Sequence, residues 1–273
     1  YHCAFGPMVR QGSAIRCIVG AYLNKRFLKN LPVLPPIVRP HRNIGDLRKE
    51  FNIPKNAIVI GRHGGKTTFD IDFVKDCIRK FINKDENTYF LFVNTEKFIE
   101  HNRVFYLNDI SDSKLSKVIE TCDAMIHGRF FGETFGLAVA EFSVANKPVI
   151  TYGKSKDKEH LMILKNKCLI YNNKQELFKI FKKLPSIIKK ESSWNAYKDY
   201  EPEIVMKKFE EICLNNKKES SYKLFISLIN DLPWEIIVFI RNILQIIKWP
   251  FFKIVPRSFK DKLKSKISKL LKN

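Results

Sequence analysis

The sequence predicts an α/β protein built on a doubly wound parallel sheet. From residue 56 onward, short apolar runs alternate with amphipathic stretches of helical periodicity. Each run is rich in β-branched or aromatic residues and lies close to Gly, Asn or Asp, as is typical of parallel strands buried on both faces. With 45% hydrophobic residues, the 273-residue chain can also bury a substantial core. This alternation favours a parallel sheet with helical crossovers.

Six apolar runs are predicted to be the strands of this sheet. They span residues 56–61, 88–94, 103–108, 123–128, 147–152 and 167–172. All six are short, which also fits buried parallel strands rather than helices. Beyond the alternation itself, the sequence has no internal repeat.

The segments between the strands are expected to be helices. After Asp70, which is a good N-cap residue, apolar side chains recur at helical spacing from Phe73 to Ile82. The stretch 111–122 repeats this pattern with Ser111 or Ser113 as its N-cap, and its inward-facing residues are predicted to be Leu115, Val118 and Ile119.

The chain is expected to divide into three parts. Residues 1–40 are interpreted as the end of a truncated N-terminal domain plus a proline-rich linker. Residues 41–216 carry the sheet and end in an amphipathic helix whose predicted apolar side is Ile204, Val205, Phe209, Ile212 and Cys213. Residues 217–273 form a basic, amphipathic extension that is expected to be helical.

The formal net charge of +21 favours anionic partners such as nucleotides, nucleic acid or an acidic membrane face. Lysine is abundant throughout the chain, so compositional bias explains the charge equally well. The six cysteines are scattered, with no CxxC pair and no His cluster at metal-ligand spacing. Reduced thiols, a cytoplasmic location and no metal site are therefore expected.

The first candidate binding loop, GRHGGKTTFD at 61–70, follows a predicted strand and precedes a predicted helix. It combines glycines that allow close backbone approach with two cations: Gly61, Gly64, Gly65, Arg62 and Lys66. A helix start adds free N–H groups, and the combination suits phosphate. The loop matches neither the GxGxxG fingerprint nor the P-loop, and a plain glycine turn is the alternative.

The second candidate loop, HGRFFGETFGLAVAEF at 127–142, has the same strand, loop, helix order. Backbone N–H groups at the helix start would point toward an anion; they belong to Phe135, Gly136 and Leu137. Glu133 alone could serve as a helix cap. Glu141 lies among apolar residues, and a buried carboxylate needs donors, which sugar or ribose hydroxyls, a backbone or a lysine could supply.

These residues resemble the donor-site motif of GT-B glycosyltransferases, specifically the retaining family 4 (glycosyl transferases group 1). The resemblance lies in two glutamates with seven residues between them, and with FGL after the first, within GETFGLAVAE at 132–141. It extends to LRKEFNIPKNAIVIGRHGGK at 47–66 and to PVIT at 148–151, and it covers roughly residues 34–214. The first forty residues are similar to the end of the family's N-terminal domain.

The resemblance implies a C-terminal donor-binding domain that takes a UDP- or GDP-sugar without an obligatory metal. Arg62 and Lys66 would bind the donor diphosphate and stabilise its developing charge, although the family commonly spaces these two residues one position further apart. Glu133 would contact hydroxyls of the transferred sugar. The other implied donor contacts are His127 and Arg129 at the sugar, Thr134, Phe135, Gly136 and Leu137 at the phosphates, and Glu141 at the ribose.

The family takes its acceptor site from a full N-terminal domain, for which this chain has no room. The expected protein is therefore a hexosyltransferase-like donor-binding fragment that is incomplete and inactive unless that domain is supplied elsewhere. Two alternatives stay open: a noncatalytic basic module that binds nucleotide or RNA, and a sugar-nucleotide epimerase. Nucleic acid is the less favoured partner.

Residues 222–273 combine aromatic and basic side chains without a stretch of about twenty apolar residues. Trp234, Trp249 and the basic run after Arg257 favour a segment that lies on an anionic membrane surface. An extra helical hairpin packed on the domain is the alternative.

Overall fold

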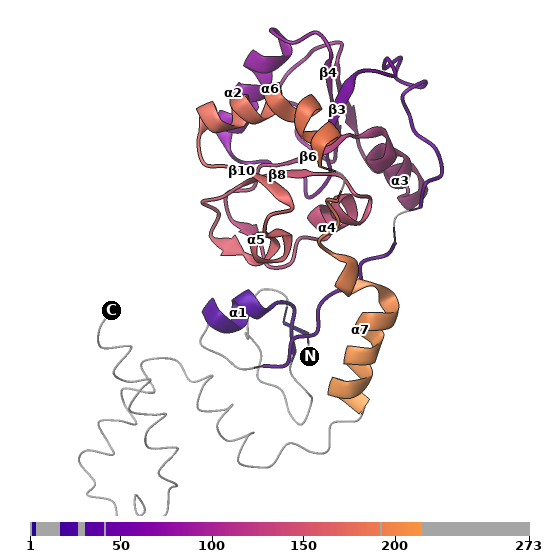
Figure 1. The fold of residues 1–273 in the computed structure, drawn as a ribbon, viewed down its shortest axis with the longest axis vertical. Helices are drawn as coiled ribbons and strands as arrows, with labels where there is room; N and C mark the ends of the chain where they lie inside the picture. The colour runs from indigo at the N-terminus through magenta and orange to yellow at the C-terminus, as the bar shows by residue number, and fades with distance from the viewer. Residues whose placement is uncertain (1, 4–16, 27–30, 41, 192, 215–273) are drawn as a thin grey trace, which may run out of the picture. The chain divides into compact units, whose positions relative to one another are not determined.

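The computed structural model describes residues 2–3, 17–26, 31–40, 42–191 and 193–214, which all belong to one unit, residues 1–217. At its centre lies a six-stranded parallel sheet with the strand order β10-β8-β6-β3-β4-β5 (Figure 1). The strands are β3 (Ile58–Arg62), β4 (Thr88–Val93), β5 (Val104–Leu107), β6 (Ala124–His127), β8 (Val149–Tyr152) and β10 (Cys168–Tyr171). Each lies within or overlaps one predicted run, and the predicted doubly wound sheet is confirmed.

Helices cover both faces of the sheet because successive strand residues point to opposite sides. Val59, Leu91 and Met125 enter one core cluster, whereas their neighbours Ile60, Phe90 and Ile126 enter another. The first cluster is closed by α3 (Asp112–Thr121) and α4 (Leu137–Val144), and the second by α2 (Asp72–Ile82) and α6 (Lys174–Lys190). Figure 1 shows α2 and α6 side by side, with α4 across the sheet from them.

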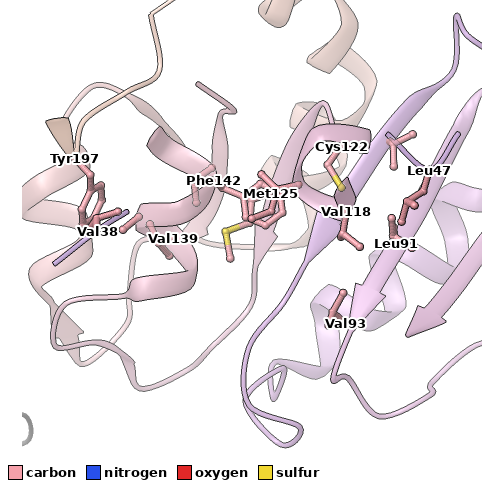
Figure 2. Close-up of a cluster of buried hydrophobic side chains, with 14 of the residues drawn as sticks. Val38, Leu47, Leu91, Val93, Val118, Cys122, Met125, Val139, Phe142 and Tyr197 are labelled. Carbon is pink, nitrogen blue, oxygen red and sulfur yellow. The ribbon is translucent and has the colours of Figure 1, made fainter. Parts of the chain in front are cut away.

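The α3–α4 side of the sheet contains a tight contact at the end of β3. In Figure 2, Cys122 and Phe142 lie in this cluster with Met125 of β6. A Cβ atom on Gly61 would lie 2.2 Å from Cys122 Sγ and 3.2 Å from Phe142 Cζ. The lack of a side chain at Gly61 therefore lets β3 pack closely against Cys122 and Phe142. Any contact of Gly61 with a nucleotide-sugar donor would be made by its backbone.

The helix starts confirm one predicted cap and correct another. Ser111 is the N-cap of α3, and its side chain accepts a hydrogen bond of 3.3 Å from the Lys114 N–H. Asp70 is not the N-cap of α2, because Ile71 takes that position without a side-chain cap. Asp70 Oδ1 instead accepts a 2.7 Å hydrogen bond from the Phe130 N–H, and thereby joins the loops after β3 and β6.

The last described helix does not bury the single apolar side that the sequence predicted for it. It comprises α7 (Pro202–Phe209) and a π-helical turn, η2 (Glu210–Leu214). Val205 is buried as predicted, but Ile204 and Phe209 are 40% and 36% exposed. The 3-10 turn η1 (Lys198–Tyr200), just before α7 in the chain, is among the elements that contact it.

Smaller elements surround the sheet, and the sequence did not reveal most of them. A parallel pair, β7 (Gly132–Glu133) and β9 (Asp157–Lys158), is followed by α5 (Glu159–Leu164). Near the start of the chain, β1 (His2–Cys3) pairs with β2 (Cys17–Ile18), which precedes α1 (Ala21–Arg26). The buried Glu159 carboxylate accepts hydrogen bonds from the N–H groups of Ala21 (3.2 Å) and Tyr22 (2.5 Å) and so holds α1.

Several predictions fall partly or wholly outside the described residues. The extension at 217–273 and its membrane contact lie there entirely, and the proposed domain boundaries stay predictions. Within the part of the chain that the structure describes, no helix combines the length and the apolar character needed to cross a bilayer. Among the described residues, four cysteines are free thiols: Cys77, Cys122, Cys168 and Cys213.

Replacing Gly61 with Ala should destabilise the fold by overpacking the contact with Cys122. We expect the free energy of unfolding to fall by about 1–3 kcal/mol, the usual cost of inserting a methyl group into a packed core. Urea unfolding of Gly61→Ala, Cys122→Ala and the double variant measures it. The double variant should be more stable than the sum of the single effects implies, whereas strict additivity would contradict the proposed clash.

Candidate functional site

The chain leaves the two central neighbouring strands, β3 and β6, toward opposite edges of the sheet. From β3 the chain proceeds through β4 to β5 at one edge, and from β6 it proceeds through β8 to β10 at the other. Because Gly61 is in register with Met125, Arg62 and His127 both lie at the carboxyl edge of these adjacent strands. In doubly wound sheets, ligands bind outside the carboxyl ends of the strands at such a switch point.

Arg62 ends β3 as a buried cation, with only 3% of its surface exposed. Its guanidinium donates to the Thr95 side chain, to the Gly65 carbonyl at 3.1 Å and to Thr68 Oγ1 at 2.7 Å. Burial lowers the pKa of Arg62 to about 10, and the carboxylates of Glu133 and Asp70 partly offset this effect. The guanidinium is therefore charged at neutral pH and fixed in position.

Glu133 lies at the same edge, in β7, between two basic side chains. Its Oε2 accepts a 2.9 Å hydrogen bond from Arg129 Nη1, and its Oε1 lies 3.3 Å from His127 Nε2. Burial raises the pKa of Glu133, but the contacts with His127 and Arg129 outweigh burial and lower the pKa below its ordinary value. Glu133 is thus a partly buried carboxylate that is ionised at neutral pH.

Two further polar residues lie behind His127. His127 Nδ1 is 3.0 Å from Thr151 Oγ1, which is also 3.2 Å from His160 Nε2. Thr151 and His160 are fully buried, and burial is the main cause that lowers the pKa of His160 to about 3. Neither residue was singled out from the sequence for a role, although Thr151 ends the PVIT run and His160 stands at the start of the short helix α5.

The start of α4, which the sequence predicted to bind an anion, has no side-chain cap, and its binding role stays a prediction. Its N-cap is Gly136, which has a left-handed φ of 85° and no side chain to cap the first turn. The first amides of a helix lack partners within it, and the helix dipole favours negative charge at this end. Leu137 is half-exposed here, whereas Phe135 is buried and its carbonyl accepts a hydrogen bond from the Tyr197 hydroxyl.

The apolar neighbours of Glu141 in the sequence suggest a buried carboxylate. In the structure its side chain is 37% exposed. Its Oε2 lies 2.7 Å from His63 Nε2, a partner that the sequence did not reveal. These two atoms are not aligned as a hydrogen bond, and both are buried without another hydrogen-bond partner among the described residues. His63 also stacks on Phe142, with ring centroids 5.9 Å apart.

The remaining predicted site residues lie on loops around this edge. Gly64 and Gly65 adjoin the Arg62 guanidinium, and Thr134, which is half-buried, follows β7. Lys66 is exposed and forms no ion pair within the described part of the chain, so its predicted role stays a prediction. No three His, Cys, Asp or Glu side chains gather as a metal site among the described residues.

Comparison with known proteins gives similarity in fold only. No protein-family model matches the sequence. No curated protein matches it either. Solved structures do match, and the region that they share with this chain has the Rossmann-like fold of GT-B glycosyltransferases, which confirms the fold inferred from the sequence.

Three of these structures illustrate the match. WaaG, a glycosyltransferase involved in lipopolysaccharide biosynthesis, has a TM-score of 0.57 at 15% identity over 75% of this chain and 64% of its own. A glycosyltransferase from Rickettsia africae has a TM-score of 0.58 at 15% identity over 75% and 65% of the two chains. HepE from Anabaena, in complex with UDP-glucose, has a TM-score of 0.57 at 16% identity over 74% and 63%. The chain therefore spans just under two thirds of the length of these proteins.

Replacing Glu133 with Gln should remove a pH-dependent contribution to stability. Because the pKa of Glu133 is lowered in the folded state, its contribution is present above the unfolded pKa of about 4.3 and is lost as the pH falls through the folded value. We expect Glu133→Gln to be less stable than wild type by about 1.5–3 kcal/mol at pH 7, the scale of hydrogen bonds to a charged group.

Urea unfolding between pH 3 and pH 7 measures this difference, which should narrow below about pH 4.3, where an unfolded glutamate becomes protonated. The matched control is Glu86→Gln, which changes an exposed glutamate and should leave the stability profile unchanged. Parallel profiles for wild type and Glu133→Gln would show that the carboxylate is not held in its ionised form.

Proposed function

We propose that residues 42–214 bind the nucleotide-sugar donor of a glycosyltransferase that transfers a hexose with retention. The observation that carries this proposal is the Glu133 carboxylate, which Arg129 and His127 hold beside the open start of α4. It lies at the sheet edge where Arg62 presents a buried cation. An ionised acceptor for hydroxyls next to two groups that favour phosphate suits a sugar linked to a diphosphate.

In this proposal, positive groups bind the donor diphosphate, whose charge grows as the bond to the sugar breaks. Arg62 is already desolvated and fixed by Thr68 and Gly65, so it needs little rearrangement to stabilise that charge. Lys66 and the backbone from Thr134 to Leu137 would complete the phosphate site. These cations and amides supply the electrostatic stabilisation, and the proposal requires no resident metal.

The two glutamates would bind hydroxyl groups at opposite ends of the donor. Glu133, together with His127 and Arg129, would contact the transferred sugar. Glu141 would accept hydrogen bonds from the ribose hydroxyls, and this binding must compete with His63, which lies 2.7 Å from the same carboxylate. The UDP-glucose bound by HepE makes UDP-sugars the first donors to test, with GDP-sugars next.

Transfer also requires an acceptor, which the described residues are not proposed to bind. In the proposal, a separate N-terminal domain supplies that surface, and without it the fragment binds donor but forms no product. The basic segment 222–273 would attach the protein to an anionic membrane face on the cytoplasmic side. That segment lies outside the described residues, and its proposal rests on the aromatic and basic composition alone.

Removing the Glu141 carboxylate should weaken donor binding. We expect the wild-type chain to bind at least one UDP- or GDP-sugar in isothermal titration calorimetry and Glu141→Ala to bind it about tenfold more weakly or worse, as the loss of charged hydrogen bonds implies. The control Glu86→Ala removes an exposed glutamate and should bind like wild type.

Three results would redirect the proposal. RNA binding without nucleotide-sugar binding would favour the noncatalytic basic module. Conversion of a bound nucleotide sugar to its epimer in the absence of acceptor would favour the epimerase. Equal affinity of wild type and Glu141→Ala would remove Glu141 from the donor site.

The membrane proposal predicts that the full chain floats with liposomes containing anionic lipid, because basic and aromatic side chains bind such surfaces. A chain that ends at residue 220 should float much less. Liposomes made only of neutral lipid are the control, and equal flotation of both chains would contradict the proposal.

A further inference from the structure

A stripe of lysines runs along the outer face of α6. The helix buries Leu177, Phe181 and Leu184 in the core on one side of the sheet. On the opposite side of the helix, within an arc of about 120° and over a length of about 17 Å, five lysines follow one another. They are Lys179, Lys182, Lys183, Lys189 and Lys190, and all five are exposed. We refer to these five residues as the lysine stripe.

The lysine stripe contains no acidic residue. From Leu177 to Lys190 the sequence has five lysines and neither Asp nor Glu. The whole chain carries 28 acidic residues for 49 basic ones, so compositional bias alone would place acids among the lysines of this helix. The absence of acids is therefore a property of this face and not only of the lysine-rich composition.

The acidic residues of α2 and α6 do not neutralise the stripe either. Asp72 and Asp76 of α2 form ion pairs with Lys75 and Arg79, the second at 2.7 Å. Glu176 accepts hydrogen bonds from neighbouring asparagines at the start of α6. Within the described part of the chain, no lysine of the stripe forms an ion pair. The positive charge of this face is thus left uncompensated.

Part of the stripe borders a groove between α6 and α2, which lie side by side in Figure 1. The groove has a volume of about 490 Å³, and no acidic residue lines it. Lys80 of α2 joins Lys179, Lys182 and Lys183 in the lining. Like charges three or four residues apart on a helix repel each other, and an anionic partner would relieve this repulsion.

The chemistry of the groove favours a lipid surface over a nucleic acid. Single-stranded nucleic acids are commonly bound by aromatic rings that stack on bases and by arginine. No arginine lines the groove, and its aromatic residue Phe178 is engaged in a T-shaped contact with Phe81, with ring centroids 5.4 Å apart. The Lys182 ammonium group lies over the Phe178 ring, 5.5 Å from its centroid. Lysine is a compact point charge that suits the diffuse charge of anionic headgroups.

We propose that the lysine stripe of α6, together with Lys80, binds the anionic surface of a lipid bilayer. The lysine stems cover the apolar part of the groove while their ammonium groups reach the headgroups. This contact belongs to the folded domain and is separate from the basic segment 222–273. It does not depend on the proposed function, because α6 contributes none of the residues assigned to the donor.

Vesicle binding by the full chain tests the proposal. The variant Lys179→Gln, Lys182→Gln, Lys183→Gln removes three charges and keeps a good helix former at each position. Its affinity for phosphatidylcholine vesicles that contain phosphatidylserine should fall about tenfold or more, since each lysine near such a surface adds about fivefold. Vesicles of phosphatidylcholine alone should bind neither protein. An unchanged affinity would overturn the proposal.

A matched control separates the stripe from the net charge of the chain. The variant Lys49→Gln, Lys55→Gln, Lys198→Gln removes the same charge from exposed positions outside the stripe. It should bind the phosphatidylserine vesicles like wild type. An equal loss of affinity in both triple variants would overturn the proposal, because net charge alone would then explain the binding.

A variant of the C-terminal segment separates this contact from the membrane contact proposed for residues 222–273. In the full chain, Arg257→Gln, Lys260→Gln, Lys262→Gln should leave the contribution of the stripe in place. Combining these changes with those of the stripe variant should therefore weaken vesicle binding further. If only the variant of the C-terminal segment loses affinity, the stripe is not a membrane contact.

Two further measurements on the stripe variant complete the test. It should bind nucleotide sugars like wild type, and in urea unfolding it should be at least as stable, because like-charge repulsion is removed. If wild type binds no nucleotide sugar, the proposed function fails while vesicle binding still decides the role of the stripe. Loss of binding to single-stranded RNA with unchanged vesicle binding would overturn the proposal in favour of nucleic acid.

Discussion

The parallel alignment of β3 and β6 is the constraint on which the rest of the site depends. Each strand ends in a long basic or imidazole side chain, and the register of Gly61 with Met125 brings Arg62 and His127 to one edge. Elsewhere in the sheet, neighbouring strands follow one another along the chain. Only between β3 and β6 do the connections diverge, so polar side chains from both loops can share one space.

The sequence predicts those elements whose structure depends on a local pattern of residues. All six strands of the main sheet were predicted, because a buried parallel strand needs a continuous apolar run whatever its neighbours are. The pair β7 and β9 was not predictable in this way. Each of its strands is two residues long, and their pairing joins Gly132 to Asp157 across an intervening helix and strand.

The same distinction applies to the candidate site. Local patterns identified both loops, Arg62, Glu133 and the open helix start, because glycines, charges and spacing are visible within a few residues. The partners of these groups come from distant elements: His63 for Glu141, Asp70 for the Phe130 amide, and Thr151 with His160 for His127. The sequence shows His63 within a candidate binding loop and His160 at a helix start, but only the fold defines what each of them contacts.

The short helix α5 links two parts of the molecule that the chain encodes far apart. Its first residue, Glu159, binds the amides of α1, and the next residue, His160, belongs to the polar interior behind His127. Two adjacent residues of α5 thus make both contacts: Glu159 holds α1, and His160 packs behind the carboxyl edge of the sheet. A change in how the upstream part of the chain rests on this domain would reach the Glu133 environment through two adjacent residues.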